Sequence, residues 1–337
     1  MIGKIFGNNK MQKITILYNV NKTDIKNSVS RIEEILKNTP EKHKHLYDFF
    51  NGKLDFEYQI RPVSTQNILY LADMDSDLFV TLGGDGTFIA QIRKYCNTIK
   101  EYNEITKWNK NPRFVGINCG NLGFLTPFSV DDFEDQFIDI LRGGGILGEN
   151  VFLNPERPRR LLEIKIFRGG ERVKKFCAVN DIVINAGFPF RMIKLGIKFY
   201  QKNIENDYFA ANFGKNHVIK GDGLLISTAM GSTAYSLSAG GPILLPDLDV
   251  FCMTPICSQS MASRPMVLSK ENVCMINLLD INDDTTLTID GQDNFLLSKK
   301  DFVCVSSFSE VVPIVILNNK KTYMEILSDK LGWETSD

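Results

Sequence analysis

Short apolar runs alternate with helical patterns through the first 120 residues of the chain. Clusters of apolar and β-branched residues predict strands at residues 14–19, 56–60, 78–82 and 113–118, the second of them at an edge. Apolar residues at three- and four-residue spacing predict helices at residues 24–38, capped by Asp24, and 87–99. Polar stretches indicate a loop or short helix at residues 40–55 and an excursion at residues 100–112. This alternation predicts a parallel sheet with right-handed crossovers.

The pattern changes after Pro127, where a linking helix over residues 130–142 leads into a region dominated by strands. These strands are expected at residues 160–167, 174–184, 193–200, 224–228, 273–279, 285–290 and 303–306. Residues 168–171 have the composition of a hairpin turn, and residues 321–331 have helical spacing. The fold class is therefore an α/β, Rossmann-like N-terminal domain plus a β-rich, sandwich-like C-terminal domain.

Three segments follow from this pattern. We expect residues 1–130 to form the Rossmann-like domain, residues 131–315 to form the β-rich domain, and residues 316–337 to pack back on the first domain.

A glycine-rich loop lies where the third predicted strand meets the following helix. It consists of Gly83, Gly84, Asp85, Gly86 and Thr87. A strand, a glycine loop and a helix N-terminus together direct backbone N–H groups at phosphate. The loop is neither a Walker sequence nor the dinucleotide fingerprint, whose third glycine is replaced by an isoleucine. Ligands of parallel sheets bind beyond the carboxyl ends of the strands, so this loop and residues 118–123 are expected to face one crevice.

A second glycine-rich stretch runs over residues 221–242 and is rich in hydroxyl side chains. Glycines allow a ligand to approach the main chain, and hydroxyls both donate and accept hydrogen bonds. Upstream, the polar pair Asn180 and Asp181 interrupts an apolar strand, which costs free energy unless the pair is hydrogen-bonded. Each feature also has a plain structural reading, as a turn or a strand end. Asp290 and Gly291 read first as a hairpin turn and second as a site.

Composition narrows the classes of function. A net charge of −1 over 337 residues gives no general attraction to nucleic acid or anionic membrane. The chain has seven cysteines without a Cys-x-x-Cys pair and only three histidines. This composition argues against a zinc site and a disulfide framework and favours reduced thiols. Apolar runs are too short for a membrane helix, and no secretory signal is expected. We expect a cytoplasmic protein, although residues 1–23, with four lysines and no acid, leave a transit segment open.

These motifs together resemble the NAD kinases over roughly residues 78–317. The resemblance rests on the glycine loop at residues 83–87, residues 116–126, the Asn180-Asp181 pair, residues 221–223 with residues 227–236, residues 254–257 and the Arg264-Pro265 pair. The first loop also occurs in phosphofructokinases and lipid kinases, whereas the stretch ending in Gly-Ser-Thr-Ala-Tyr-Ser is far more specific.

The resemblance implies transfer of the γ-phosphoryl group of ATP to the 2′-hydroxyl of the adenosine ribose of NAD, in a cleft between the domains of a homodimer or homotetramer. It implies that Asp85 is catalytic and that Mg²⁺ or another divalent metal accompanies ATP, held by ligands that the sequence does not identify. The implied nucleotide-binding residues are Gly83, Gly84, Asp85, Gly86, Thr87, Asn180, Asp181, Lys220, Asp222, Thr233, Ala234, Tyr235, Ser236, Leu237 and Ser238.

Two positions depart from the family. Asp181 stands where glutamate is usual, and Lys220 stands where arginine is frequent, which loses the bidentate fork. A lipid kinase would share only the first glycine loop, and a non-catalytic regulator would bind NAD without forming NADP. A serine hydrolase is disfavoured because no Gly-x-Ser-x-Gly elbow occurs.

Overall fold

The computed structural model describes residues 12–22, 25–42, 56–63, 75–106, 112–120, 123–141, 159–188, 191–202, 209–212, 217–308, 312, 314–315 and 322–333. Some positions named in the sequence analysis lie outside these ranges. They are the expected cap Asp24, residues 1–11 of the lysine-containing N-terminal stretch, most of residues 40–55, and residues 121–122. The chain divides into two compact units, one of residues 1–98, 102–156 and 313–337 and one of residues 99–101 and 157–312.

The first unit is built on a parallel sheet in the strand order β18-β4-β3-β1-β2. Its strands are β1 (Gln12–Asn19), β2 (Phe56–Val63), β3 (Leu78–Gly83), β4 (Arg113–Asn118) and β18 (Ile314–Val315). Its helices are α1 (Ile25–Lys42), α2 (Asp85–Thr106), α3 (Val130–Leu141) and α5 (Tyr323–Leu331). The predicted parallel sheet is confirmed, and β2 lies at its edge as expected.

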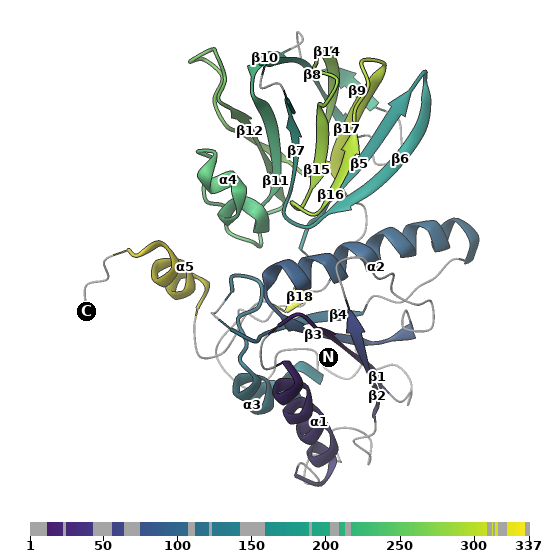
Figure 1. Cartoon of the computed structure of the whole chain (residues 1–337), viewed down its shortest axis with the longest axis vertical. Coiled ribbons are helices and arrows are strands. Elements are labelled where there is room, and N and C mark those ends of the chain that lie inside the picture. Colours follow the sequence, from purple (N-terminus) through teal and green to yellow (C-terminus); the bar gives the residue numbers. More distant parts are fainter. Residues whose placement is uncertain are drawn as a thin grey trace. The chain divides into compact units, whose positions relative to one another are not determined.

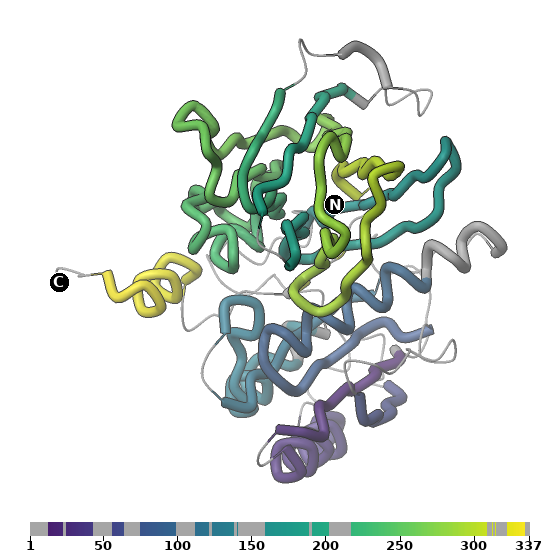
Figure 2. Tube along the Cα trace, turned by 45° about the horizontal axis from the view of Figure 1, so that its top comes forward, coloured from purple at the N-terminus to yellow at the C-terminus, as the bar shows by residue number. Residues whose placement is uncertain are grey.

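Helices cover both faces of this sheet. α2 lies on one face, where Tyr95 packs edge-on against the stacked rings of Phe79 and Phe114. α1 and α3 lie side by side on the other face (Figures 1 and 2). Their apolar residues share one core with the strands, so the helix expected to link the domains packs within the first unit.

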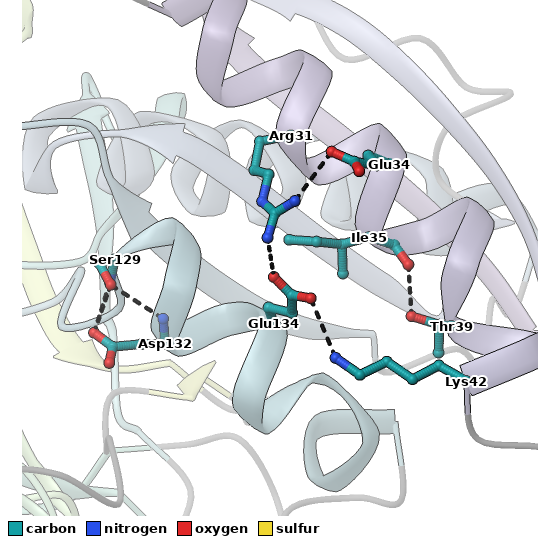
Figure 3. Close-up of polar contacts among 8 residues, drawn as sticks. All are labelled: Arg31, Glu34, Ile35, Thr39, Lys42, Ser129, Asp132 and Glu134. Carbon is teal, nitrogen blue, oxygen red and sulfur yellow. Dashed lines mark hydrogen bonds and ion pairs between the residues drawn. The ribbon is translucent and has the colours of Figure 1, made fainter.

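An exposed ion network also joins α1 to α3 (Figure 3). Arg31 contacts Glu34 at 3.0 Å and Glu134 at 2.6 Å, and Lys42 reaches Glu134 at 3.2 Å. Ser129 caps α3 by exchanging hydrogen bonds with Asp132. Such exposed pairs contribute at most about 1 kcal/mol each, so the shared apolar core remains the main stabilising contact.

The second unit consists of two antiparallel sheets that share one apolar core. The first sheet contains β5 (Leu162–Arg168), β6 (Glu171–Ala178), β8 (Ile193–Lys202), β9 (Phe209–Asn212), β10 (His217–Gly221), β14 (Asn272–Asp280) and β17 (Asp301–Ser307). The second contains β7 (Asp181–Asn185), β11 (Gly223–Thr228), β12 (Val250–Ile256), β13 (Met266–Ser269), β15 (Thr286–Ile289) and β16 (Asp293–Leu296). The sandwich-like second domain is therefore confirmed.

Two predicted elements need correction. α2 continues to Thr106 instead of ending near residue 99, because Lys100, Glu101 and Glu104 are good helix formers. The single strand expected over residues 174–184 is two strands, β6 and β7, separated at Val179 and Asn180. Among the described helices, none is long and apolar enough to cross a bilayer.

Candidate active site

The first glycine loop lies where the strand order of the parallel sheet reverses, between β1 and β3. Gly83 ends β3, Gly84 follows, and Asp85, Gly86 and Thr87 form the first turn of α2. In open α/β sheets this position is where ligands bind. The sequence-predicted loop therefore sits at a ligand-binding edge and at the N-terminus of a 22-residue helix.

A cation that no sequence motif singles out lies beside this loop. A side chain placed on Gly84 would have its Cβ 3.9 Å from the ammonium of Lys22, which follows β1. Asn19, at the end of β1, donates from its amide to the Thr87 hydroxyl at 3.1 Å. Open space over a glycine, a lysine and a helix N-terminus together form a suitable environment for phosphate.

The Asp85 carboxylate is held by the loop that follows β4. Its Oδ1 accepts from the backbone N–H groups of Leu125 (3.2 Å) and Thr126 (3.0 Å) and from the Thr126 hydroxyl (2.7 Å). Its Oδ2 accepts one described bond, from the Phe124 N–H at 2.9 Å. A carboxylate offers about four acceptor sites in total, two on each oxygen. Oδ2 therefore has more capacity than Oδ1 for a further hydrogen-bond donor.

The second motif, residues 116–126, explains how that loop reaches Asp85. A Cβ on Gly123 would lie 2.0 Å from Asp85 Oδ1, and a Cβ on Gly116 would lie 2.4 Å from the Thr126 methyl. Asn118, at the end of β4, donates to the Thr126 hydroxyl at 3.0 Å. Both glycines are therefore needed for close approach, a role that the motif's composition alone did not reveal.

In the second unit, the Asn180-Asp181 pair lies against the segment that follows β11. The Thr228 hydroxyl donates to the Val179 carbonyl at 2.8 Å, and the Thr228 N–H donates to the Asn180 carbonyl at 2.8 Å. A Cβ on Gly231 would lie 2.1 Å from that same carbonyl oxygen. The structure therefore brings together the polar pair and the Gly-Ser-Thr-Ala-Tyr-Ser segment.

Buried polar atoms near this junction lack hydrogen-bond partners among the described residues. They are Asn180 Oδ1, Ser227 Oγ and Ser236 Oγ. Ser227 is paired with Asp181 in the β11–β7 register, and Ser236 lies in the short helix α4 (Tyr235–Ser238). A buried polar atom without a partner costs about 1–3 kcal/mol, so these atoms favour a ligand that would pair with them.

The remaining residues of this segment differ in exposure. Thr233 ends the 3-10 helix Met230–Thr233 and, like Ala234 and Leu237, is partly buried. Ser238 is exposed, and the Tyr235 side chain is 49% exposed. A tyrosine half open to solvent is available for stacking on a ligand and is not a core residue.

Asp181 begins β7 and is only 5% exposed. Burial raises the pKa of this carboxyl to about 7, and the neighbouring Asp290 carboxylate adds to the rise. The side chain therefore changes protonation state close to neutral pH.

Lys220 and Asp222 lie at the opposite end of β11 from Thr228. Both are exposed, and the Asp222 N–H donates to the Ile256 carbonyl at 3.0 Å. Because β11 is six residues long, its two ends are about 17 Å apart. A ligand that contacts both Thr228 and Asp222 in one copy of the chain must therefore span that length.

No cluster of three or more histidine, cysteine, aspartate or glutamate side chains suited to a metal occurs in the part of the chain that the structure describes. Mg²⁺ in kinases is commonly held by one or two carboxylates together with substrate phosphates and water. The residues present are compatible with a metal that arrives with the nucleotide, and the Asp85 carboxylate is the acidic group at the glycine loop.

Comparison with known proteins agrees with these features. The family model of the ATP-NAD kinase C-terminal domain matches residues 179–317. The NAD kinase of Geotalea daltonii is 33% identical over 258 residues, 77% of this chain and 79% of that protein. The NAD kinase of Chlorobium phaeobacteroides is 30% identical over 321 residues, 95% of this chain and 97% of that protein.

Two solved structures share the fold. Yeast NADH kinase complexed with NADH has a TM-score of 0.65 at 21% identity, with 98% of this chain and 90% of that one covered. The NAD kinase of Archaeoglobus fulgidus in complex with ATP has a TM-score of 0.62 at 21% identity, with 96% and 100% covered. With relatives at 30% identity or more along most of its length, the chain belongs to the NAD kinase family.

Proposed function

We propose that this NAD kinase binds NAD at the junction of Asn180 with the residue 227–238 segment and binds ATP phosphates at the glycine loop of residues 83–87. The enzyme phosphorylates NAD with ATP, and the acceptor is the 2′-hydroxyl of the adenosine ribose. The observation that carries the dinucleotide assignment is the set of three buried polar atoms without partners among the described residues, Asn180 Oδ1, Ser227 Oγ and Ser236 Oγ.

The reaction assigns a task to Asp85. As the ribose oxygen forms its bond to the γ-phosphorus, the bond from that phosphorus to the leaving oxygen of ADP breaks. Asp85 Oδ2 accepts the hydroxyl proton, a contribution typically worth about 10²–10⁴-fold in rate. Lys22 and the α2 N-terminus stabilise the phosphate charge.

The metal, the remaining dinucleotide contacts, the compartment and the oligomeric state are assigned from chemistry and from the family. The divalent metal enters with ATP as the MgATP substrate, where it neutralises phosphate charge. Lys220 and Asp222 remain proposed dinucleotide contacts, at the far end of β11 from the other residues. All seven cysteines are free thiols, which suits a reducing compartment, and we propose a cytoplasmic homodimer or homotetramer.

One assay tests the reaction itself. Purified protein is incubated with MgATP and NAD, and NADP is measured with an NADP-specific dehydrogenase. NADP formation that requires both substrates is expected. NAD binding without NADP formation would contradict the proposal and indicate a regulator.

Replacing Asn180 with alanine should raise the KM for NAD about 5- to 150-fold and leave the KM for ATP nearly unchanged. The reason is that a hydrogen bond from the ligand to Asn180 Oδ1, at ~1–3 kcal/mol, would be lost. Steady-state kinetics with each substrate varied checks this. An equal rise in both constants, or a lower melting temperature alone, would indicate a purely structural role for Asn180.

Replacing Tyr235 with alanine should also raise the KM for NAD, by about fivefold, because a half-exposed ring can stack on a base and contributes ~1 kcal/mol. Tyr235→Phe is the matched control, since it keeps the ring and loses only the hydroxyl. A phenylalanine variant as weak as the alanine variant would assign the effect to the hydroxyl and contradict stacking.

A further inference from the structure

Asp290 holds the backbone of the Asn180-Asp181 pair by its carboxylate. Oδ1 accepts from the N–H groups of Val179 (3.1 Å), Asn180 (2.7 Å) and Asp181 (3.1 Å), and Oδ2 also accepts from Val179 (3.1 Å). The Asp290 N–H returns a bond to the Asp181 carbonyl at 2.9 Å. A single side chain therefore satisfies three consecutive donors at the gap between β6 and β7.

The opposite, carbonyl side of the same segment is held by β11 and the turn after it. Thr228 bonds to both the Val179 and Asn180 carbonyls, and its hydroxyl accepts from the Gly231 N–H at 2.9 Å. The backbone of residues 179–181 therefore has little freedom, because its N–H groups bind Asp290 and its Val179 and Asn180 carbonyls bind Thr228. The Asn180 side-chain Oδ1 is left buried, with no partner among the described residues.

Asp290 adopts an uncommon backbone conformation to make these contacts. It occupies the turn between β15 and β16 with a φ of 48°, followed by Gly291 at 64°. Non-glycine residues with positive φ are uncommon, although aspartate and asparagine tolerate this region best. The turn itself would equally accept asparagine or glycine at this position. The carboxylate at this position is explained by the three N–H groups that it binds.

We propose that Asp290 is a positioning residue for NAD recognition. Its carboxylate fixes the segment of residues 179–181 so that the Asn180 amide points at the dinucleotide before the ligand arrives. Without this contact the segment would pay its ordering entropy on binding, which lowers affinity. This inference rests on the proposed NAD site at Asn180.

Two substitutions separate the carboxylate from the turn. Asp290→Gly keeps a residue that tolerates a φ of 48° but removes every side-chain hydrogen bond to residues 179–181. Asp290→Asn keeps the same backbone preference, and its amide oxygen can take the place of Oδ1, which accepts from all three N–H groups. The control is Gly169→Ala, in the β5–β6 hairpin turn at a φ of 62°, where a Cβ meets nothing within 4 Å.

Calorimetric titration with NAD in the absence of ATP measures the dissociation constant, and kinetics give the KM for each substrate. Asp290→Gly should weaken NAD binding at least about tenfold and change the KM for ATP less than about twofold. Asp290→Asn should recover most of the affinity, and Gly169→Ala should bind NAD as the wild type does. Unchanged NAD affinity in Asp290→Gly, an equal change for both substrates, or no recovery in Asp290→Asn would overturn the proposal.

Thr228→Val provides the same test if Asp290→Gly does not fold. It removes the hydroxyl bonds to Val179 and Gly231 and should weaken NAD binding several-fold, whereas unchanged affinity would contradict positioning of this segment. Asn180→Ala distinguishes the two levels of inference. If it leaves NAD affinity unchanged, the proposed NAD site is wrong; if it weakens binding while Asp290→Gly does not, only the role of Asp290 is rejected.

Discussion

Replacing Asp85 with asparagine should lower kcat by at least a hundredfold. The amide cannot take the proton of the ribose hydroxyl at neutral pH, and a general base contributes about 10²–10⁴-fold. The substitution also disturbs the loop. If the amide oxygen keeps the three bonds at Oδ1, its NH₂ group faces the Phe124 N–H, which donates at 2.9 Å in the wild type. We therefore expect a stability loss of ~1–3 kcal/mol besides the loss of turnover.

The Thr126→Val variant separates the role of Asp85 as a base from the hydrogen bonding that holds its carboxylate. This variant keeps the carboxylate and two backbone donors at Oδ1 but removes the hydroxyl bond of 2.7 Å. Its kcat should fall less than about tenfold, although its stability should fall by a similar ~1–3 kcal/mol. Single-turnover kinetics and denaturant titration of both variants make the comparison. Similar losses of kcat in Asp85→Asn and Thr126→Val would mean that Asp85 acts by holding the loop and not as a base.

The order of elements in the first unit could be predicted because periodicity marks strands and helices locally. The runs at residues 78–82 and 113–118 are mostly apolar, as expected of buried parallel strands, and they are β3 and β4. The end of α2 was misjudged because charge was taken as a sign of irregular structure. Lysine and glutamate stop a strand more readily than they stop a helix.

The break between β6 and β7 could not be found by periodicity. Residues 174–184 are apolar enough for one strand, and the interruption depends on Asp290, which is 110 residues from Asn180 in the chain. The sequence did indicate that a polar pair in an apolar strand needs partners. It did not indicate which residue supplies them, because long-range hydrogen bonds leave no local pattern.

The same distinction applies to the candidate site. Glycine loops and the polar pair were visible as motifs, since glycines and buried polar residues are locally unusual. Lys22 and Thr126 were not assigned roles, because a lysine after a strand and a threonine before a proline are ordinary. Only the register of β1, β3 and β4 places their ends together at one edge of the sheet. Asp222, grouped with Tyr235 by proximity in the sequence, lies at the other end of β11.

Asp181→Asn should stabilise the protein at high pH and remove part of its pH dependence. The folded-state pKa of Asp181 is raised from 3.8 to about 7, so ionisation is harder in the folded chain than in the unfolded one. The resulting cost is absent below pH ~4, grows as pH rises towards ~7 and is complete above that. At ~1.4 kcal/mol per pKa unit, it reaches about 4 kcal/mol.

The measurement is the free energy of unfolding from pH 4 to pH 8. The wild type should lose stability relative to Asp181→Asn as pH rises, and the two should converge near pH 4, where both side chains are neutral. Asp283→Asn, at an exposed turn residue, is the matched control and should follow the wild type throughout. If the Asp181→Asn and wild-type curves stay parallel, the Asp181 carboxyl is not a group that titrates near neutral pH.

NAD affinity measured over the same range then tests whether the protonated, hydrogen-bond-donating form of Asp181 is the form that binds, since the asparagine variant mimics that form at every pH.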